Sequence, residues 1–173
     1  MKVLLLNGSP RKNGCTYTAL NVVADALKAE GIDAEVFQAG DPDMENVKAA
    51  AAKLKDSDAL VVGSPVYWAS PSGQIIEFMD RLASVAGKDM LYKPAAAVAS
   101  ARRAGTTATL DVLTKYFSYH QMPVVSSCYW NMVHGNTPEE VMKDEEGVQI
   151  MRVLGKNMAW LLKCIEAGNK NGV

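Results

Sequence analysis

The chain has 173 residues, of which 49% are hydrophobic and 21% are charged, and its formal net charge is −1. This length and composition predict one globular domain, residues 1–173, burying roughly 70% of its unfolded surface, and they exclude a disordered chain. The near-zero charge offers no basic face to a nucleic acid. No apolar stretch approaches the roughly 20 residues that span a membrane, and we expect no signal peptide before the first apolar run.

The number and spacing of the cysteine and histidine residues indicate a reducing compartment and predict that the chain has no metal site. Cys15, Cys128 and Cys164 are widely spaced and odd in number, which is typical of neither a disulfide framework nor a zinc site. His120 and His134 have no acidic or cysteine partner at ligand spacing. We therefore expect a cytoplasmic protein without a metal site.

Apolar runs without polar alternation recur along the chain, as in strands of a parallel sheet that is covered on both faces. In chain order they are Val3–Leu6, Ala34–Phe37, Ala59–Val62, Ala95–Ala99 and Val124–Val125. Segments with helical spacing of apolar residues lie between and after them, at Leu20–Leu27, Met44–Leu54, Ile75–Leu82, Leu110–Phe117 and Met151–Ile165. This alternation predicts an α/β fold, a doubly wound parallel sheet of five strands with helices on both faces.

Two features qualify this pattern. The pairs Asp41-Pro42 and Ser70-Pro71 each combine a capping residue with a proline, and they predict the starts of the second and third helices. Residues Ser126–Gly147 form an expected connector between the fifth strand and the last helix.

The first strand leads into a loop that is suited to a phosphate. Residues 7–16 read NGSPRKNGCT, and a helix follows. Backbone N–H groups and the positive end of the helix dipole would meet there, and Ser9, Arg11 and Thr16 would add donors. Cys15 is either a reactive thiol at a helix N-terminus or a small residue that fits a tight loop.

Two further loops follow expected strand ends at the same edge of the sheet, where ligands bind in folds of this kind. Residues 63–71 read GSPVYWASP, and Tyr67 and Trp68 offer a flat apolar wall to a planar ring. Residues 100–107 read SARRAGTT, which supplies donors and, at Gly105, room for close backbone approach. Taken singly, each of these features is also typical of capping, packing or surface residues.

Together the three loops predict one elongated ligand with a phosphate and a planar ring, and flavin mononucleotide (FMN) fits this description. ATP fits less well, because the first loop lacks the lysine of a Walker A motif. A dinucleotide fits poorly, because there is no G-x-G-x-x-G and the second strand ends in Gln38 rather than an acidic residue.

The chain resembles, over nearly its whole length, the flavodoxin-like NAD(P)H-dependent FMN reductases, which include quinone reductases and iron–sulfur flavoproteins. The resemblance is carried by GSPRKNGCT (Gly8–Thr16) and SPVYWASPSGQIIEFMDR (Ser64–Arg81). It implies a three-layer sandwich with strand order 2-1-3-4-5. The cofactor-binding residues that it implies are Ser9, Arg11, Gly14, Cys15 and Thr16 around the phosphate, Pro65, Val66, Tyr67 and Trp68 along the ring, and Ser100, Arg102 and Gly105 on its other side.

The sequence departs from the family pattern in two places. Iron–sulfur flavoproteins carry a compact cysteine cluster after the second strand, whereas this stretch contains no cysteine, so we expect no iron–sulfur cluster. The third loop, ARRAGTT, is poorer in glycine than is usual in the family.

The expected function is that of an FMN-dependent oxidoreductase with no catalytic side chain of its own, because the flavin supplies the redox chemistry. It would pass hydride from NADH or NADPH to a quinone, a nitro- or azo-aromatic compound or free flavin. The alternatives are a flavodoxin-like one-electron carrier, which the near-neutral charge disfavours, and a binding module that has lost its cofactor. The sequence does not decide the acceptor or the nicotinamide.

The connector 126–147 bears on assembly. Its apolar stretch Tyr129–Val133 predicts contact with another subunit in a dimer or tetramer, or alternatively packing on the chain's own last helix. His134 would reach a substrate or make a structural hydrogen bond.

Overall fold

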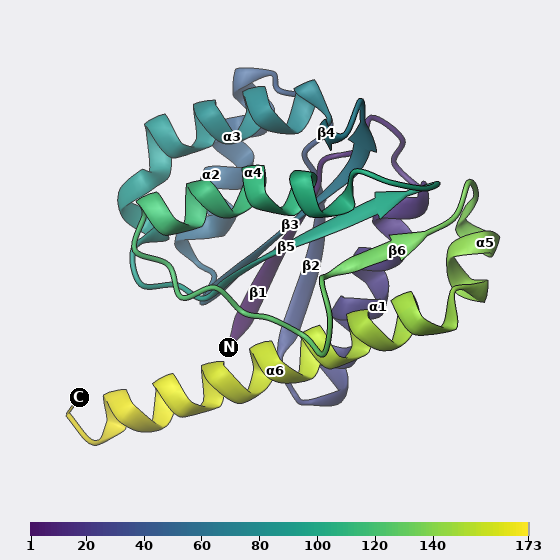
Figure 1. Cartoon of the computed structure of the whole chain (residues 1–173). Coiled ribbons are helices and arrows are strands. Elements are labelled where there is room, and N and C mark those ends of the chain that lie inside the picture. Colours follow the sequence, from purple (N-terminus) through teal and green to yellow (C-terminus); the bar gives the residue numbers. More distant parts are fainter. Residues whose placement is uncertain (173) are drawn as a thin grey trace.

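The computed structural model describes residues 1–172, which form a three-layer α/β sandwich (Figure 1). The strands are β1 (Lys2–Asn7), β2 (Asp33–Gln38), β3 (Ala59–Tyr67), β4 (Ser70–Pro71), β5 (Ala95–Ala101) and β6 (Met132–His134). The helices are α1 (Cys15–Ala29), α2 (Met44–Lys55), α3 (Gly73–Ala86), α4 (Thr106–Tyr119), α5 (Pro138–Lys143) and α6 (Glu145–Lys170), with a 3-10 turn, η1, at Gly87–Met90.

The sheet has the order β2-β1-β3-β5-β6, and all neighbours in this path are parallel. The short β4 lies off the path and pairs antiparallel with the end of β3. When this hairpin strand is set aside, the order is the expected 2-1-3-4-5, so the predicted fold is confirmed.

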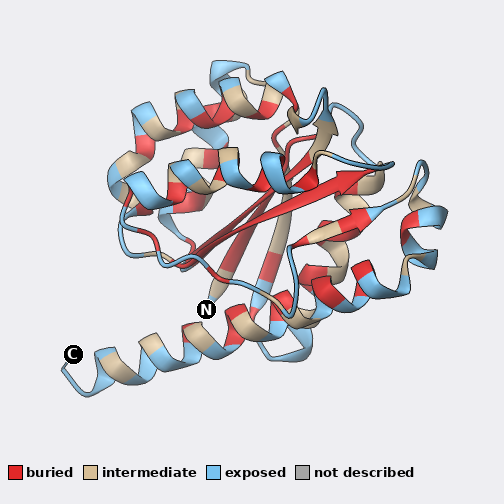
Figure 2. Cartoon of the chain, in the orientation of Figure 1, coloured by how far each residue is buried: buried red, intermediate tan, exposed pale blue. Residues whose placement is uncertain are grey.

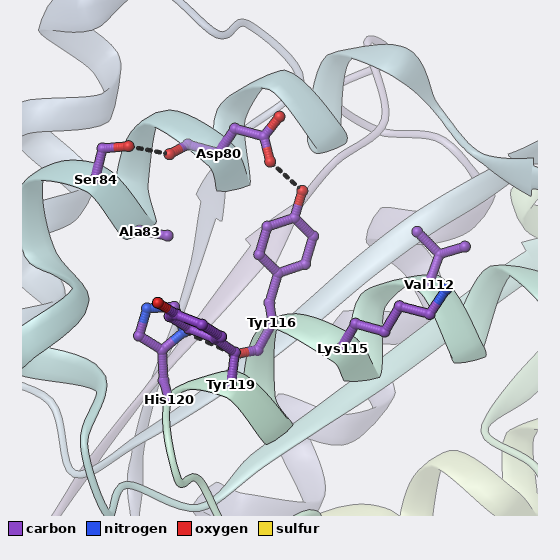
Figure 3. A pocket seen from close by; sticks show the side chains of 8 residues that line it. All are labelled: Asp80, Ala83, Ser84, Val112, Lys115, Tyr116, Tyr119 and His120. Atoms are coloured by element: carbon purple, nitrogen blue, oxygen red, sulfur yellow. Dashed lines mark hydrogen bonds between the residues drawn. The ribbon is translucent and has the colours of Figure 1, made fainter.

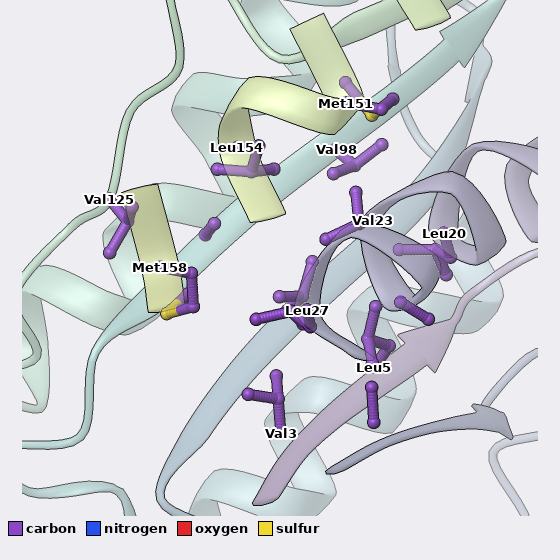
Figure 4. Close-up of a cluster of buried hydrophobic side chains, with 14 of the residues drawn as sticks. Val3, Leu5, Leu20, Val23, Leu27, Val98, Val125, Met151, Leu154 and Met158 are labelled. Carbon is purple, nitrogen blue, oxygen red and sulfur yellow. The ribbon is translucent and has the colours of Figure 1, made fainter. Parts of the chain in front are cut away.

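The central strands carry continuous apolar runs because each strand buries both faces. On β1, Val3 and Leu5 belong to a core with α1 and α6, whereas Leu4 and Leu6 belong to a second core with α2, α3 and α4. Figure 4 shows the first core, in which Val23 of α1 and Leu154 of α6 pack over the sheet. Figure 2 shows the same pattern of burial: the central strands β1, β3 and β5 are mostly buried, the edge strand β2 is mostly of intermediate exposure, and the long helices are buried along their inner sides.

The prediction of the fifth strand was wrong. Val124 makes one isolated bridge with Ala95, and the fifth place in the sheet is taken by β6, inside the expected connector 126–147. The same segment also contains α5 and the start of α6, which begins at Glu145, and its remaining residues are loop.

Each of the two predicted helix starts lies two residues before the observed one. Asp43 rather than Asp41 caps α2. Ser70 and Pro71 form β4, and Ser72 caps α3.

Candidate functional site

The loop between β1 and α1 leaves the N-terminus of α1 without an internal cap. Gly14 occupies the N-cap position and makes no side-chain cap bond, and the same holds for Gly105 at α4, whereas Asp43, Ser72, Thr137 and Asp144 cap α2, α3, α5 and α6. Within residues 1–172, no protein acceptor meets the backbone N–H groups of residues 12–17. A cluster of unpaired N–H groups at the positive end of a helix dipole is a site for an anion.

Two buried hydroxyl groups join this loop to the end of β5. Thr16 Oγ1 and Ser100 Oγ lie 2.7 Å apart, and both residues are almost wholly buried. Ser9 is also buried, and its Oγ accepts a hydrogen bond from the Arg11 N–H at 3.1 Å. Ser100 therefore lies beside the first loop, nearer to the expected phosphate end than the resemblance implied.

The β3–β4 hairpin turns through two residues in a strained conformation. Trp68 has φ 53° and Ala69 has φ 58°, which is the left-handed region that costs a residue other than glycine about 1–2 kcal/mol. The side chain of Trp68 is fully exposed. Strain of this kind persists where surrounding structure enforces it.

The surrounding structure in this case is the loop between β5 and α4. Gly105 has φ 99°, and a Cβ atom there would lie 2.7 Å from the Cα of Ala69 and 2.8 Å from Val66 Cγ1. Only a glycine permits this approach, so Gly105 holds the hairpin against the end of β5.

These loops enclose a cavity of about 190 Å³ at the carboxyl edge of the sheet. Nine of the twelve predicted residues line it: Ser9, Arg11, Cys15, Thr16, Pro65, Val66, Tyr67, Ser100 and Arg102. Gly14, Trp68 and Gly105 do not; the first precedes α1, the second points to solvent and the third packs on the hairpin.

The cavity has three lining residues that sequence analysis missed: Ala101, Gly135 and Asn136. The last two follow β6, whose pairing with the end of β5 brings them to the same edge. The turn-forming pair Gly-Asn after a short apolar run was the available indication.

Cys15 lies in the lining as a protonated thiol. Burial raises its pKa, and its Sγ donates to the carbonyl oxygen of Gly135 at 3.6 Å. His134 lies outside the lining, and its Nε2 is 3.1 Å from the carbonyl oxygen of Arg103, a structural contact.

A larger hollow of about 670 Å³ lies between the C-terminal halves of α3 and α4 (Figure 3). Its polar groups partner one another: Tyr116 donates to the carboxylate of Asp80, and His120 Nδ1 is 2.7 Å from the Tyr116 carbonyl oxygen. Burial, followed by the Asp80 hydrogen bond and charge, raises the pKa of Tyr116. These helix halves lie toward the amino ends of the strands, whereas the cavity formed by the loops lies at the carboxyl ends. The two hollows are therefore separate.

Among residues 1–172, no group of three or more His, Cys, Asp or Glu side chains is placed to hold a metal ion. No helix in this part of the chain is long and apolar enough to cross a membrane.

The donor set of the cavity fits FMN. Unpaired N–H groups, Arg11 and the hydroxyls suit a phosphate and a polyol chain, while Pro65, Val66 and Tyr67 suit a planar ring. A sequence profile described as NADPH-dependent FMN reductase matches residues 1–137. The chain belongs to this family.

Membership makes the protein an oxidoreductase that uses FMN, with NAD(P)H as co-substrate. It is 29% identical to an iron-sulfur flavoprotein of Methanocaldococcus jannaschii, over 96% of this chain and 100% of that protein. It is 30% identical to an NADPH azoreductase of a Bacillus species, over 58% of this chain and 59% of that protein.

Solved structures support the fold. A flavodoxin from the domain Archaea superposes with a TM-score of 0.73 at 18% identity, covering 94% of this chain and 99% of that chain. A WrbA-like flavodoxin from Agrobacterium tumefaciens gives a TM-score of 0.74 at 18% identity, covering 94% and 97%.

Proposed function

We propose that this protein passes hydride from NADH or NADPH to a small-molecule acceptor through FMN held in the cavity at the carboxyl edge of the sheet. The acceptor classes are a quinone, a nitro- or azo-aromatic compound, or free flavin. The observation that carries the proposal is the convergence of an uncapped helix N-terminus, two arginines and an apolar wall on one cavity. The azoreductase relative supports the aromatic acceptors.

The chain's own groups divide the work of binding. The N–H groups of the first loop and Arg11 would hold the phosphate, together with the hydroxyls of Ser9 and Thr16. Pro65, Val66 and Tyr67 would cover one side of the ring and exclude water. Arg102, which also lines the cavity, would offset negative charge that develops on the ring.

Bound FMN would supply the two-electron chemistry. The lining residues include no carboxylate and no histidine, and burial keeps Cys15 protonated. No lining side chain is therefore assigned as an acid–base catalyst or a nucleophile.

Trp68 is the most exposed of the predicted residues, and it does not line the cavity. We propose that its indole, next in the chain to Tyr67, contacts the nicotinamide or the acceptor from the rim. Trp68→Ala would then raise the KM of the acceptor and leave the Kd of FMN within about twofold, because an exposed side chain adds little to a buried site.

The deciding experiment is anaerobic reduction of the FMN-loaded protein with NADH and with NADPH. Bleaching of the flavin absorption band, followed by reoxidation with each acceptor class, supports the proposal. Absence of bleaching with both nicotinamides refutes it. A one-electron carrier would instead exchange single electrons with a protein partner, which a redox titration distinguishes from a two-electron transition.

We also propose that the protein is a homo-oligomer of the cytoplasm. Tyr129 and Trp130 are about half exposed and stack edge to face at a centroid distance of 4.6 Å beside β6. Exposed aromatic pairs of this kind are typical of contact surfaces. Sedimentation that finds only an 18.6 kDa species at micromolar concentration refutes the assembly.

A further inference from the structure

Two amide side chains lie beneath the first loop and contact its backbone at Ser9, Arg11 and Lys12. Asn7 is the last residue of β1 and is wholly buried, and in the parallel register it is the partner of Gln38 on β2. Asn7 Nδ2 donates to Gln38 Oε1 at 2.7 Å. The two side chains thus form one connected unit at the carboxyl end of adjacent strands.

This unit fixes both backbone polar groups of Ser9. The Ser9 N–H donates to Asn7 Oδ1 at 3.2 Å, and Gln38 Nε2 donates to the Ser9 carbonyl oxygen at 2.6 Å. A residue held at both its N–H and its C=O cannot turn either adjoining peptide group without breaking a buried hydrogen bond. The position of the Ser9 hydroxyl is set as a result.

Asn7 also holds the far side of the loop. Its Nδ2 group reaches the Lys12 carbonyl oxygen at 3.2 Å and the Arg11 carbonyl oxygen at 3.4 Å. In a trans peptide the C=O and the following N–H point in opposite directions. Turning these carbonyls inward therefore turns the N–H groups of Lys12 and Asn13 outward, and neither has a protein acceptor within residues 1–172.

Close packing around Gly8 and Gly40 adds to the support of the first part of the loop. A Cβ on Gly40 would lie 2.0 Å from the Ser9 carbonyl oxygen and 2.7 Å from Gln38 Nε2. A Cβ on Gly8 would lie 2.6 Å from Ile75 Cβ. Gly8 and Ser9 are therefore held by these close glycine contacts as well as by the two amides.

We propose that Asn7 and Gln38 are positioning residues that pre-organise the N–H groups of the first loop for a phosphate monoester. This inference rests on the proposed function, in which that phosphate belongs to FMN. Neither amide lines the cavity, so the pair acts through the loop rather than on the ligand. Pre-organisation raises affinity because the loop need not be ordered when the ligand binds.

The test compares binding of FMN and of riboflavin, which lacks the phosphate, in Gln38→Met, Asn7→Ala and Asn46→Ala. Asn46 is a matched control, since its Nδ2 donates to the carbonyl oxygens of Gln38 and Asp41 and does not touch the first loop. Gln38→Met preserves length and leaves β2 paired, so it keeps the test valid if Asn7→Ala does not fold.

We expect Gln38→Met to weaken FMN binding about three- to tenfold, which corresponds to one or two hydrogen bonds lost, and Asn7→Ala to weaken it further. The Kd of riboflavin should stay within about twofold of its original value in both variants. Asn46→Ala should leave the Kd of both FMN and riboflavin unchanged. A variant that weakens both flavins equally, or neither, overturns the positioning role. If the unaltered protein binds riboflavin as tightly as FMN, the phosphate site of the proposed function fails instead, and the two failures are thereby separated.

Discussion

Thr16 Oγ1 and Ser100 Oγ share a hydrogen bond of 2.7 Å that joins the start of α1 to the end of β5. Ser100→Ala would leave the buried Thr16 hydroxyl without this partner, at a cost of about 1–3 kcal/mol. Thr16→Val, which is nearly isosteric, should cost a similar amount. Denaturant unfolding of the protein without FMN measures both.

The double variant separates the bond from its surroundings. We expect Thr16→Val combined with Ser100→Ala to cost about 1 kcal/mol less than the sum of the single changes, because no polar group is then left unpaired. Simple additivity would show that the two hydroxyls do not interact.

Gly105 is predicted to be intolerant of a side chain. Gly105→Ala places a Cβ 2.7 Å from the backbone of Ala69 in addition to the left-handed cost of about 1–2 kcal/mol. Gly31→Ala is the matched control, since Gly31 has φ 79° but no atom within 4 Å of the added Cβ. We expect Gly105→Ala to lower the free energy of unfolding by at least about 1 kcal/mol more than Gly31→Ala, and equal losses would argue against the close contact.

Tyr116 should make stability fall in alkali. Burial and the neighbouring Asp80 raise its pKa above the ordinary value of about 10. Below pH 10 the phenol is neutral in both states, so its contribution is fully present. As the pH rises above 10, the unfolded chain loses the proton while the folded chain retains it, and the free energy of unfolding decreases.

Urea unfolding at several pH values between 9 and 11 measures the slope of the free energy of unfolding against pH. Tyr116→Phe should flatten it, whereas Tyr119→Phe should not, because Tyr119 is largely exposed. Identical slopes in the protein and in Tyr116→Phe would contradict the assignment.

Cys15 is predicted to be the slowest of the three thiols to react. Its pKa is raised by burial, while Cys128 and Cys164 are exposed. Iodoacetamide at pH 7 followed by peptide mass mapping should label Cys128 and Cys164 first, and FMN should slow Cys15 further. The Cys15→Ala variant should still oxidise NAD(P)H. If the variant lost this activity, the thiol would have a chemical role.

The sequence predicted the parts of the site that lie on long, regular elements. β1, β3 and β5 are buried on both faces, so their apolar runs marked the strand ends from which Ser9, Tyr67 and Ser100 project. The helices after these strands were equally evident, because their apolar residues recur at a spacing of three to four.

The features that the sequence did not predict depend on how the strands pair in the folded chain. β6 has three residues, and its place was assigned instead to Val124–Val125, whose apolar pair gives one bridge to Ala95. Gly135 and Asn136 were missed for the same reason, since they reach the cavity through β6. The contact between the Asn7 and Gln38 side chains could not be predicted either, because it depends on the register of β1 against β2.

The strand order has one more consequence, for association between chains. A sheet grows by adding strands at its edges, and here the edges are β2 and β6. β6 offers three residues, and β2 carries Glu35, which forms ion pairs with Lys2 and Lys53. Because one edge is short and the other charged, edge-to-edge pairing and the aggregation that it seeds are disfavoured, so the assembly proposed above would use helices and loops.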